Sequence, residues 1–208
     1  MRLIIIGTEY TGKTTLALAL RQWGLERGIQ HHMDDHFSIP DCQMLKAKAD
    51  QEIMLGLPQI LKERYQRFQL AYHVRLNNKY EHIILVGFHI EERIYGPRYY
   101  YPDVGRAGET PNAWEAGMSS DSILVLLHAD PDVIAKRMEE DTHDYPVVPK
   151  EDIEEVQAEF QHEFRRSWFM RKFQIDTSDL AAGDILDTFL KASVPHLNER
   201  DLAIRQMI

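Results

Sequence analysis

The chain has 208 residues, of which 44% are hydrophobic and 27% charged, and this composition is typical of a folded domain rather than a disordered segment. Its formal charge of −9 disfavours general binding to nucleic acid, although a local basic groove could override that average. Cys42 is the only cysteine, so an internal disulfide is excluded. The sequence contains no run of about 18 apolar residues, so a membrane span is not expected. We therefore expect a cytoplasmic protein.

Short apolar runs predict the strands of a sheet. In chain order they are Leu3–Ile6, a weaker run at Ile29–Met33, Ile83–Val86, Ile123–Leu127 and Phe173–Ile175. Most of these runs are apolar throughout instead of alternating with polar residues. We therefore expect parallel strands that are covered on both faces.

Helical patterns lie between these runs. They cover Thr14–Glu26, which Gly28 closes, the long stretch Cys42–Asn77, then Asp132–Glu140, Lys150–Phe169 and Asp184–Ala192, with one more surface helix after Pro195. Pro58 should divide the long stretch into two helices, because proline favours the first position of a helix. The alternation of strands and helices predicts an α/β fold of three layers, with a mostly parallel sheet and helices on both faces.

Two segments lack a regular pattern. Tyr95–Gly117 holds four of the eleven glycines and three prolines, and Glu139–Pro149 is acidic and ends in Tyr-Pro-Val-Val-Pro. Irregular stretches of this length in a compact domain are often lids or binding loops. We predict that residues 1–208 form a single domain and that residues 139–149 form its lid.

Residues 7–14 read Gly-Thr-Glu-Tyr-Thr-Gly-Lys-Thr and match the phosphate-loop pattern G-x-x-x-x-G-K-[ST] between a strand and a helix. The glycines let backbone N–H groups surround phosphates, and the helix N-terminus adds a favourable dipole. Lys13 should reach the β- and γ-phosphates, and the Thr14 hydroxyl should hold Mg²⁺. The pattern predicts binding of ATP with Mg²⁺ by Gly7, Thr8, Glu9, Tyr10, Thr11, Gly12, Lys13, Thr14 and Thr15.

Other classes of P-loop protein fit these residues less well. GTPases read guanine through Asn-Lys-x-Asp after a strand, whereas Asn78-Lys79-Tyr80-Glu81 precedes a strand, lacks the Asp and is interpreted as the end of a helix. Motor ATPases place an acidic pair directly after a strand. Here Glu91 and Glu92 follow the strand end at Val86 after an interval of four residues. The motor interpretation is weakened and stays open.

Three patches resemble the P-loop nucleoside and nucleotide kinases, which include the thymidylate kinases and deoxynucleoside kinases. Met33–Phe37 resembles the Asp-Asp-Phe patch of uridine kinases, in which an Asp activates the acceptor hydroxyl. Glu91–Tyr99 is similar to the Glu-Arg-Ser-Ile-Tyr-Ser-x-Arg-Tyr patch of deoxynucleoside kinases, with the Ser missing. Ile123–Arg137 looks like the strand and helix that lead to a kinase lid. The resemblance implies a central first strand and a lid with arginines, yet this chain has none between Arg137 and Arg165.

Phosphoryl transfer to a hydroxyl needs positioned charges and a base within hydrogen-bond reach. Asp35 is the first candidate for the base and Asp34 the second, with a solvated strand-end turn as the alternative. Glu91 or Glu92 could orient water on Mg²⁺ or bind the acceptor, or could form the acidic first turn of a helix.

Arginines and aromatic residues offer further candidates. Arg93 and Arg98 could hold a phosphate or form surface salt bridges, and Arg137 is the candidate at the base of the lid. Tyr99–Tyr101 with Trp114 could stack on a base or simply pack, whereas a metal site at His31, His32 and His36 is disfavoured. The predicted catalytic residues are Lys13, Asp35, Glu91, Arg93 and Arg137.

These features predict an ATP-dependent kinase that transfers the γ-phosphoryl group to a small hydroxyl or phosphate acceptor, with a nucleoside or nucleotide as first choice. One alternative is a regulatory or mechanical NTPase. Another is a kinase for a modified base or an end of a polynucleotide, which the charge of −9 disfavours. The sequence allows a homodimer, and it leaves the acceptor, the choice of ATP over GTP and the oligomeric state undecided.

Overall fold

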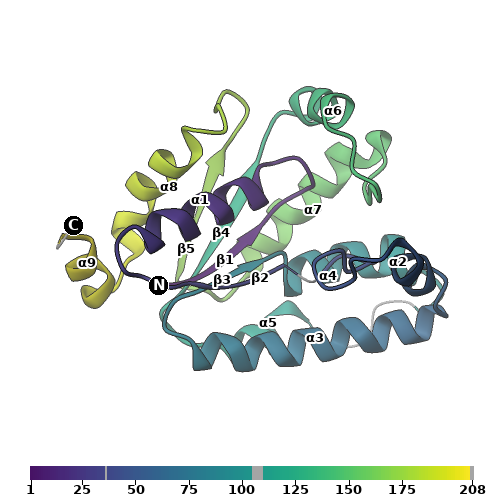
Figure 1. The fold of residues 1–208 in the computed structure, drawn as a ribbon, viewed down its shortest axis with the longest axis horizontal. Helices are drawn as coiled ribbons and strands as arrows, with labels where there is room; N and C mark the ends of the chain where they lie inside the picture. Colours follow the sequence, from purple (N-terminus) through teal and green to yellow (C-terminus); the bar gives the residue numbers. More distant parts are fainter. Residues whose placement is uncertain (36, 105–109, 207–208) are drawn as a thin grey trace.

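The computed structural model describes residues 1–35, 37–104 and 110–206 (Figure 1). Its centre is a five-stranded sheet in the order β2-β3-β1-β4-β5, and all four neighbouring pairs are parallel. The strands are β1 Arg2–Ile6, β2 His32–Asp34, β3 Ile83–Val86, β4 Ser122–His128 and β5 Arg171–Asp176. Four of the predicted strands, the parallel pairing and the central place of β1 are confirmed. The weaker run Ile29–Met33 is wrong in its bounds, because β2 begins at His32 and ends at Asp34.

Helices cover both faces of this sheet (Figure 1). The strands are apolar throughout because alternate residues enter two different cores: Leu3 and Ile5 pack on one face, and Ile4 and Ile6 on the other. The first core also receives side chains from α1 Lys13–Leu25 and α8 Ile185–Ser193. The second receives side chains from α3 Gln59–Lys79, α4 His89–Tyr95 and α7 Ile153–Arg166.

Several helix boundaries differ from the sequence prediction. The stretch Cys42–Asn77 divides at Pro58 as predicted, but its first helix, α2 Lys48–Leu55, begins later. The predicted helix Lys150–Phe169 begins as a 3₁₀ turn at Lys150–Asp152 and ends at Arg166. α6 Pro131–Glu140 begins at Pro131, directly after Asp130, as the Asp-Pro signal predicts, and α9 Glu199–Gln206 is the surface helix after Pro195.

The segment Tyr95–Gly117 is more regular than predicted. It contains a π-helix at Gly96–Tyr100 and α5 Pro111–Glu115, while residues 105–109 lie outside the described part of the chain. Tyr100 and Tyr101 are buried, and their burial in the second core stabilises local structure that glycine and proline content alone does not indicate. Across the described residues, every helix is too short or too polar to cross a membrane.

Candidate active site

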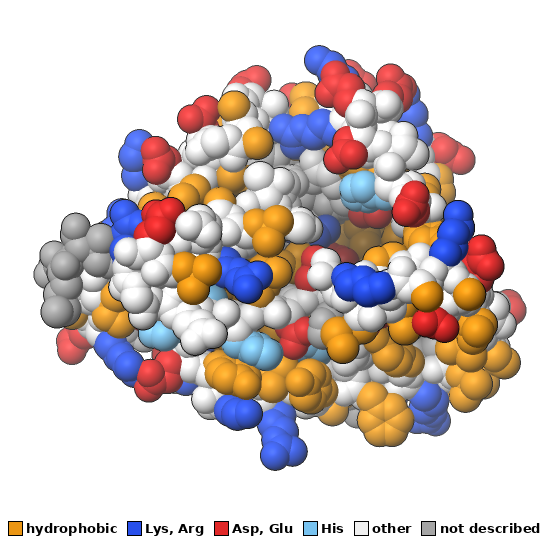
Figure 2. Space-filling model, in the orientation of Figure 1, with side chains coloured by type: hydrophobic (Ala, Val, Ile, Leu, Met, Phe, Trp, Pro, Cys, Tyr) orange, Lys and Arg blue, Asp and Glu red, His pale blue; other side chains and the backbone are white. Residues whose placement is uncertain are grey.

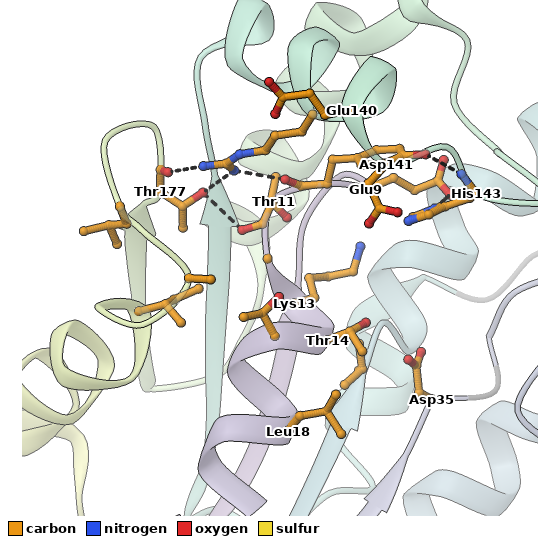
Figure 3. A pocket seen from close by; sticks show the side chains of 18 of the residues that line it. Glu9, Thr11, Lys13, Thr14, Leu18, Asp35, Glu140, Asp141, His143 and Thr177 are labelled. Carbon is orange, nitrogen blue, oxygen red and sulfur yellow. Dashed lines mark hydrogen bonds and ion pairs between the residues drawn. The ribbon is translucent and has the colours of Figure 1, made fainter.

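A cavity of about 770 Å³ opens at the carboxyl ends of the central strands, beside the start of α1, and the surface is hollowed there (Figure 2, Figure 3). This is the edge of a parallel sheet where ligands of α/β proteins bind. Most of the predicted site residues line it, namely Glu9, Tyr10, Thr11, Gly12, Lys13, Thr14, Thr15, Asp35, Glu91 and Arg137. Gly7 and Thr8 lie within the loop, and Arg93 is not among the lining residues.

The phosphate loop joins β1 to α1, and two glycines give it its shape. Gly7 has φ 147°, and a Cβ atom there would lie 2.2 Å from the carbonyl oxygen of Leu127. Gly12 has φ 92° and precedes the first residue of α1. The Thr11 hydroxyl donates to the Thr8 carbonyl over 2.7 Å, inside the loop. These constraints leave the N-terminus of α1 open toward the cavity, as anion binding requires.

Lys13 is held at the centre of the loop. Its Nζ donates to the carbonyl oxygens of Gly7 at 2.5 Å and Thr8 at 3.2 Å, and it lies 3.3 Å from Oε2 of Glu91. The ammonium group therefore joins the loop to α4, which follows a different strand of the sheet. The hydroxyl-bearing Thr14 lies beside it in the cavity (Figure 3).

Glu91 reaches the cavity because of a sharp turn between β3 and α4. Gly87 has φ 84° and Phe88 has φ 86°, a conformation that is strained for phenylalanine and of the kind found at functional sites. Phe88 is fully buried, which stabilises the turn. Burial raises the pKa of Glu91; the Lys13 ammonium opposes this rise and the nearby Asp35 adds to it.

Asp34, the last residue of β2, and Asp35, which follows it, occupy different environments. Asp34 is 4% exposed, and its Oδ2 lies 3.3 Å from Nε2 of both His32 and His73. Asp35 lines the cavity on the side opposite the phosphate loop (Figure 3). Neighbouring residues at the end of a strand point to opposite sides, which explains the difference. Of the two, Asp35 lines the cavity and Asp34 does not.

Arg137 joins three segments at the rim of the cavity. Its Nη1 donates to the carbonyl oxygen of Tyr10 at 3.0 Å, and its Nη2 donates to that of Thr177 at 2.6 Å. The Thr177 hydroxyl in turn donates to the Thr11 carbonyl over 3.1 Å. Sequence analysis missed Thr177, because a single threonine after β5 belongs to no local motif.

The other candidates lie away from the cavity. Arg98 forms salt bridges with Glu155 at 2.9 Å and Glu159 at 2.8 Å, as the surface alternative proposed. Glu92 accepts a hydrogen bond from the Tyr101 hydroxyl. Burial, and next the neighbouring Glu63 carboxylate, raise the pKa of Glu92 to about 7.

No preformed metal cluster of His, Cys, Asp or Glu is present among the described residues, and His36 lies outside them. Mg²⁺ is usually bound through one or two carboxylates together with substrate phosphates and water, so it does not need such a cluster. The Thr14 hydroxyl, with Asp35 and Glu91 in the same cavity, supplies hard oxygen donors of the right kind. The residues present therefore fit a Mg²⁺ ion that arrives with a triphosphate.

The acidic segment after α6 lies against the phosphate loop. Residues 141–149 contain no helix or strand, and the backbone N–H groups of Val147 and Val148 donate to the Glu9 carboxylate. Tyr10 contacts the same segment at His143. Sequence analysis placed Glu9 and Tyr10 among the nucleotide-binding residues and did not anticipate these contacts.

No protein-family model and no curated protein sequence matches the chain. Its fold matches the YorR protein of Bacillus subtilis in complex with phosphorylated GDP, at TM-score 0.62 and 17% identity, over 96% of this chain and 100% of that one. It also matches deoxyadenosine kinase from M. mycoides with bound dATP, at TM-score 0.60 and 14% identity, over 92% of this chain and 98% of that one. A gluconokinase from Sinorhizobium meliloti 1021 matches at TM-score 0.54 and 15% identity, over 98% of this chain and 96% of that one. Identities this low show the fold alone, which is the expected fold of P-loop kinases.

Proposed function

We propose that the protein is a kinase that transfers the γ-phosphoryl group of ATP, bound with Mg²⁺, to a hydroxyl group of a small molecule. The observation that carries the proposal is one cavity lined by three elements: a complete phosphate loop with Lys13, Asp35 after β2, and Glu91 from α4. A triphosphate site and two carboxylates on a shared cavity provide both halves of a phosphoryl transfer.

The phosphate loop forms the donor half. Its backbone N–H groups and the α1 N-terminus bind phosphate oxygens, and Lys13 balances their negative charge. Thr14 would hold Mg²⁺, which supplies charge neutralisation on the phosphates when bound. Arg137 holds the rim of the loop through the Tyr10 carbonyl and so keeps the cradle in shape.

The carboxylates form the acceptor half. The hydroxyl oxygen of the acceptor attacks the γ-phosphorus, the bond from that phosphorus to the bridging oxygen breaks, and the electron pair leaves with the nucleoside diphosphate. Asp35 orients the hydroxyl and takes its proton, and the products are ADP and the phosphate ester. Glu91 keeps Lys13 in place through their ion pair at 3.3 Å.

The charge of the cavity favours a hydroxyl acceptor over a phosphate acceptor. Lys13 and Arg137 are the lysine and arginine side chains that line it within the described residues, and both belong to the donor half. On the acceptor side, Asp35 and Glu91 would repel a second phosphate. Deoxyadenosine and gluconate, the acceptors in the names of two structural neighbours, are hydroxyl compounds. A nucleoside is the first acceptor to test.

Two further features belong to this proposal. Residues 1–208 act as a single P-loop domain, and residues 139–149 act as its lid. Glu139 and Glu140 of this lid are the end of α6, and residues 141–149 are the part without helix or strand. The contacts of Val147 and Val148 with the phosphate loop support the second feature, because they place the segment beside the donor half of the cavity. A lid there would exclude water from the transferring group.

Product analysis tests the function directly. The purified protein is incubated with ATP, Mg²⁺ and a panel of nucleosides, nucleoside monophosphates and sugars, and products are identified by mass spectrometry. We expect a phosphate ester of a hydroxyl compound, formed by the wild type and not by Lys13→Ala, which controls for contaminating kinases. Release of ADP without any phosphorylated acceptor would favour an NTPase instead. A phosphorylated nucleoside monophosphate as main product would overturn the choice of acceptor.

A further inference from the structure

The carboxylate of Glu9 binds the lid segment from within the phosphate loop. Its Oε2 accepts backbone N–H groups from Val147 at 2.8 Å and Val148 at 2.9 Å, and its Oε1 lies 3.5 Å from Nδ1 of His143. The Glu9 side chain is 14% exposed. Hydrogen bonds from backbone N–H groups to a carboxylate are among the stronger ones in proteins.

Tyr10 adds a second contact to the same segment. Its ring stacks on the ring of His143, with centroids 4.2 Å apart and planes inclined by 16°, and its hydroxyl accepts the His143 backbone N–H over 3.1 Å. Val148 is 1% exposed and belongs to the second core, so the segment is anchored beyond these polar contacts. We call the contacts of Glu9 and Tyr10 with residues 143–148 the latch.

The latch links the lid to the donor half electrostatically. Glu9 lines the same cavity as Lys13 and Thr14. A carboxylate left without partners in that cavity would repel the polyphosphate of a nucleotide. When residues 147 and 148 are seated against the loop, their N–H groups donate hydrogen bonds to the Glu9 carboxylate and stabilise its negative charge on the side that faces the lid. A bound triphosphate must therefore favour the seated lid, and the seated lid must favour the triphosphate to the same extent.

We propose that Glu9 is a positioning residue that couples closure of the 141–149 lid to triphosphate binding. The inference rests on the proposed function for its ligand and names the regulation of that site. The coupling depends on a carboxylate of the phosphate loop that binds lid backbone, and it needs no arginine from the lid. The chain has no arginine between Arg137 and Arg165.

Hydrogen exchange at the amides of Val147 and Val148 tests the coupling. It is measured with and without a non-hydrolysable ATP analogue and Mg²⁺, in the wild type, Glu9→Gln and Glu9→Ala. Glu139→Gln is the matched control, because Glu139 lies at the end of α6, directly before residues 141–149, but is exposed and bonds to Lys150 at 2.8 Å. Dissociation of the nucleotide is followed in parallel.

We expect the analogue to slow exchange of these amides in the wild type and in Glu139→Gln by about 5-fold or more, the range of ordinary coupling between sites. Glu9→Ala should abolish this slowing and speed nucleotide release by a similar factor. Glu9→Gln should restore part of it, since an amide oxygen still accepts the two N–H groups but carries no negative charge. Unchanged exchange in β1 and α8 would show that the variants are folded.

Equal slowing in the wild type and Glu9→Ala would overturn the coupling while leaving the kinase proposal intact. So would a higher KM for the acceptor in Glu9→Gln with unchanged lid exchange, because that result assigns Glu9 to acceptor binding. Failure of the proposed function is recognised separately: the wild type would neither bind the analogue nor form a phosphate ester. In that case no coupling exists, and faster exchange in nucleotide-free Glu9→Ala would leave only a structural latch.

Discussion

The two halves of the cavity are built in different ways. The donor half is a continuous loop whose shape depends on Gly7 and Gly12, and its proposed ligand-binding groups are mostly backbone N–H groups and Lys13. The acceptor half is assembled from Asp35 after β2 and Glu91 after the strained turn at Phe88. The first is a local motif, and the same loop conformation serves to bind the phosphates of any nucleoside triphosphate. The second depends on how separate strands end, so it is the half in which substrate choice can vary.

Lys13→Ala should have the largest effect, because it removes the charge that both halves share. Lys13 contacts the loop carbonyls and lies 3.3 Å from Glu91. We expect triphosphate turnover to fall by at least about 10³-fold in a folded protein. Titration calorimetry with an ATP analogue and a turnover assay measure it, and the exposed Lys136→Ala on α6 is the control. Unchanged nucleotide affinity and unchanged turnover would show that Lys13 takes part in neither triphosphate binding nor phosphoryl transfer.

Asp35→Asn should affect the acceptor half alone. A neutral amide keeps the shape but accepts no proton, and loss of a positioned base costs about 10²–10⁴ in rate. ATP affinity should stay close to that of the wild type, because the donor contacts come from the loop. Single-turnover transfer and nucleotide binding are compared with Asp187→Asn, an exposed site on α8. A matched loss of ATP affinity would make Asp35 a metal ligand, and a near wild-type rate would move the base to another carboxylate.

Gly7→Ala should show how tightly the donor loop is packed. The new Cβ would meet the Leu127 carbonyl oxygen at 2.2 Å, at φ 147°. We expect the free energy of unfolding to fall by about 2–4 kcal/mol. Gly28→Ala is the matched control, since φ is 72° there and nothing lies within 4 Å. It should cost only the backbone penalty of about 1–2 kcal/mol. Equal losses in denaturant titrations of both variants would contradict the close packing.

Glu92→Gln should have the smallest effect, on stability and its pH dependence. The pKa of Glu92 is about 7 in the folded protein against an ordinary value of 4.5, mainly because of burial. Between these values the folded state binds more protons than the unfolded state, so stability falls as pH rises through the window and stays lower above it. The glutamine variant should match the wild type near pH 4 and exceed it by about 1–3 kcal/mol at pH 8.

Denaturant titrations from pH 4 to pH 8 measure this difference, with the exposed Glu154→Gln on α7 as control. A constant difference across the range would show that Glu92 does not titrate there. That result would leave its hydrogen bond to Tyr101 as the whole of its role. It would also show that burial raises the pKa of Glu92 less than its environment indicates.

The sheet and the donor half could be predicted because their signals are local. Leu3–Ile6 and Ile83–Val86 are short and apolar at every position, as is expected of a strand that is covered on both faces. The glycine and Lys13 spacing defines the loop within eight residues. The π-helix at Gly96–Tyr100 was missed, because Tyr100 is buried against residues distant in the sequence. The helix α5 was missed, because its buried Glu115 bonds to His89 and to the backbone N–H of Trp168, which are also distant.

The sequence by itself determined a parallel sheet with a phosphate loop after the first strand. Apolar runs along the chain indicate the strands, and the spacing of the glycines and Lys13 specifies the loop. Only the tertiary structure decided that Asp35 and not Asp34 enters the cavity, that Arg93 stays outside it and that Glu9 reaches Val147. The direction of a side chain at a strand end depends on how the strand pairs. A contact between residues 138 positions apart leaves no trace in the residues around either one.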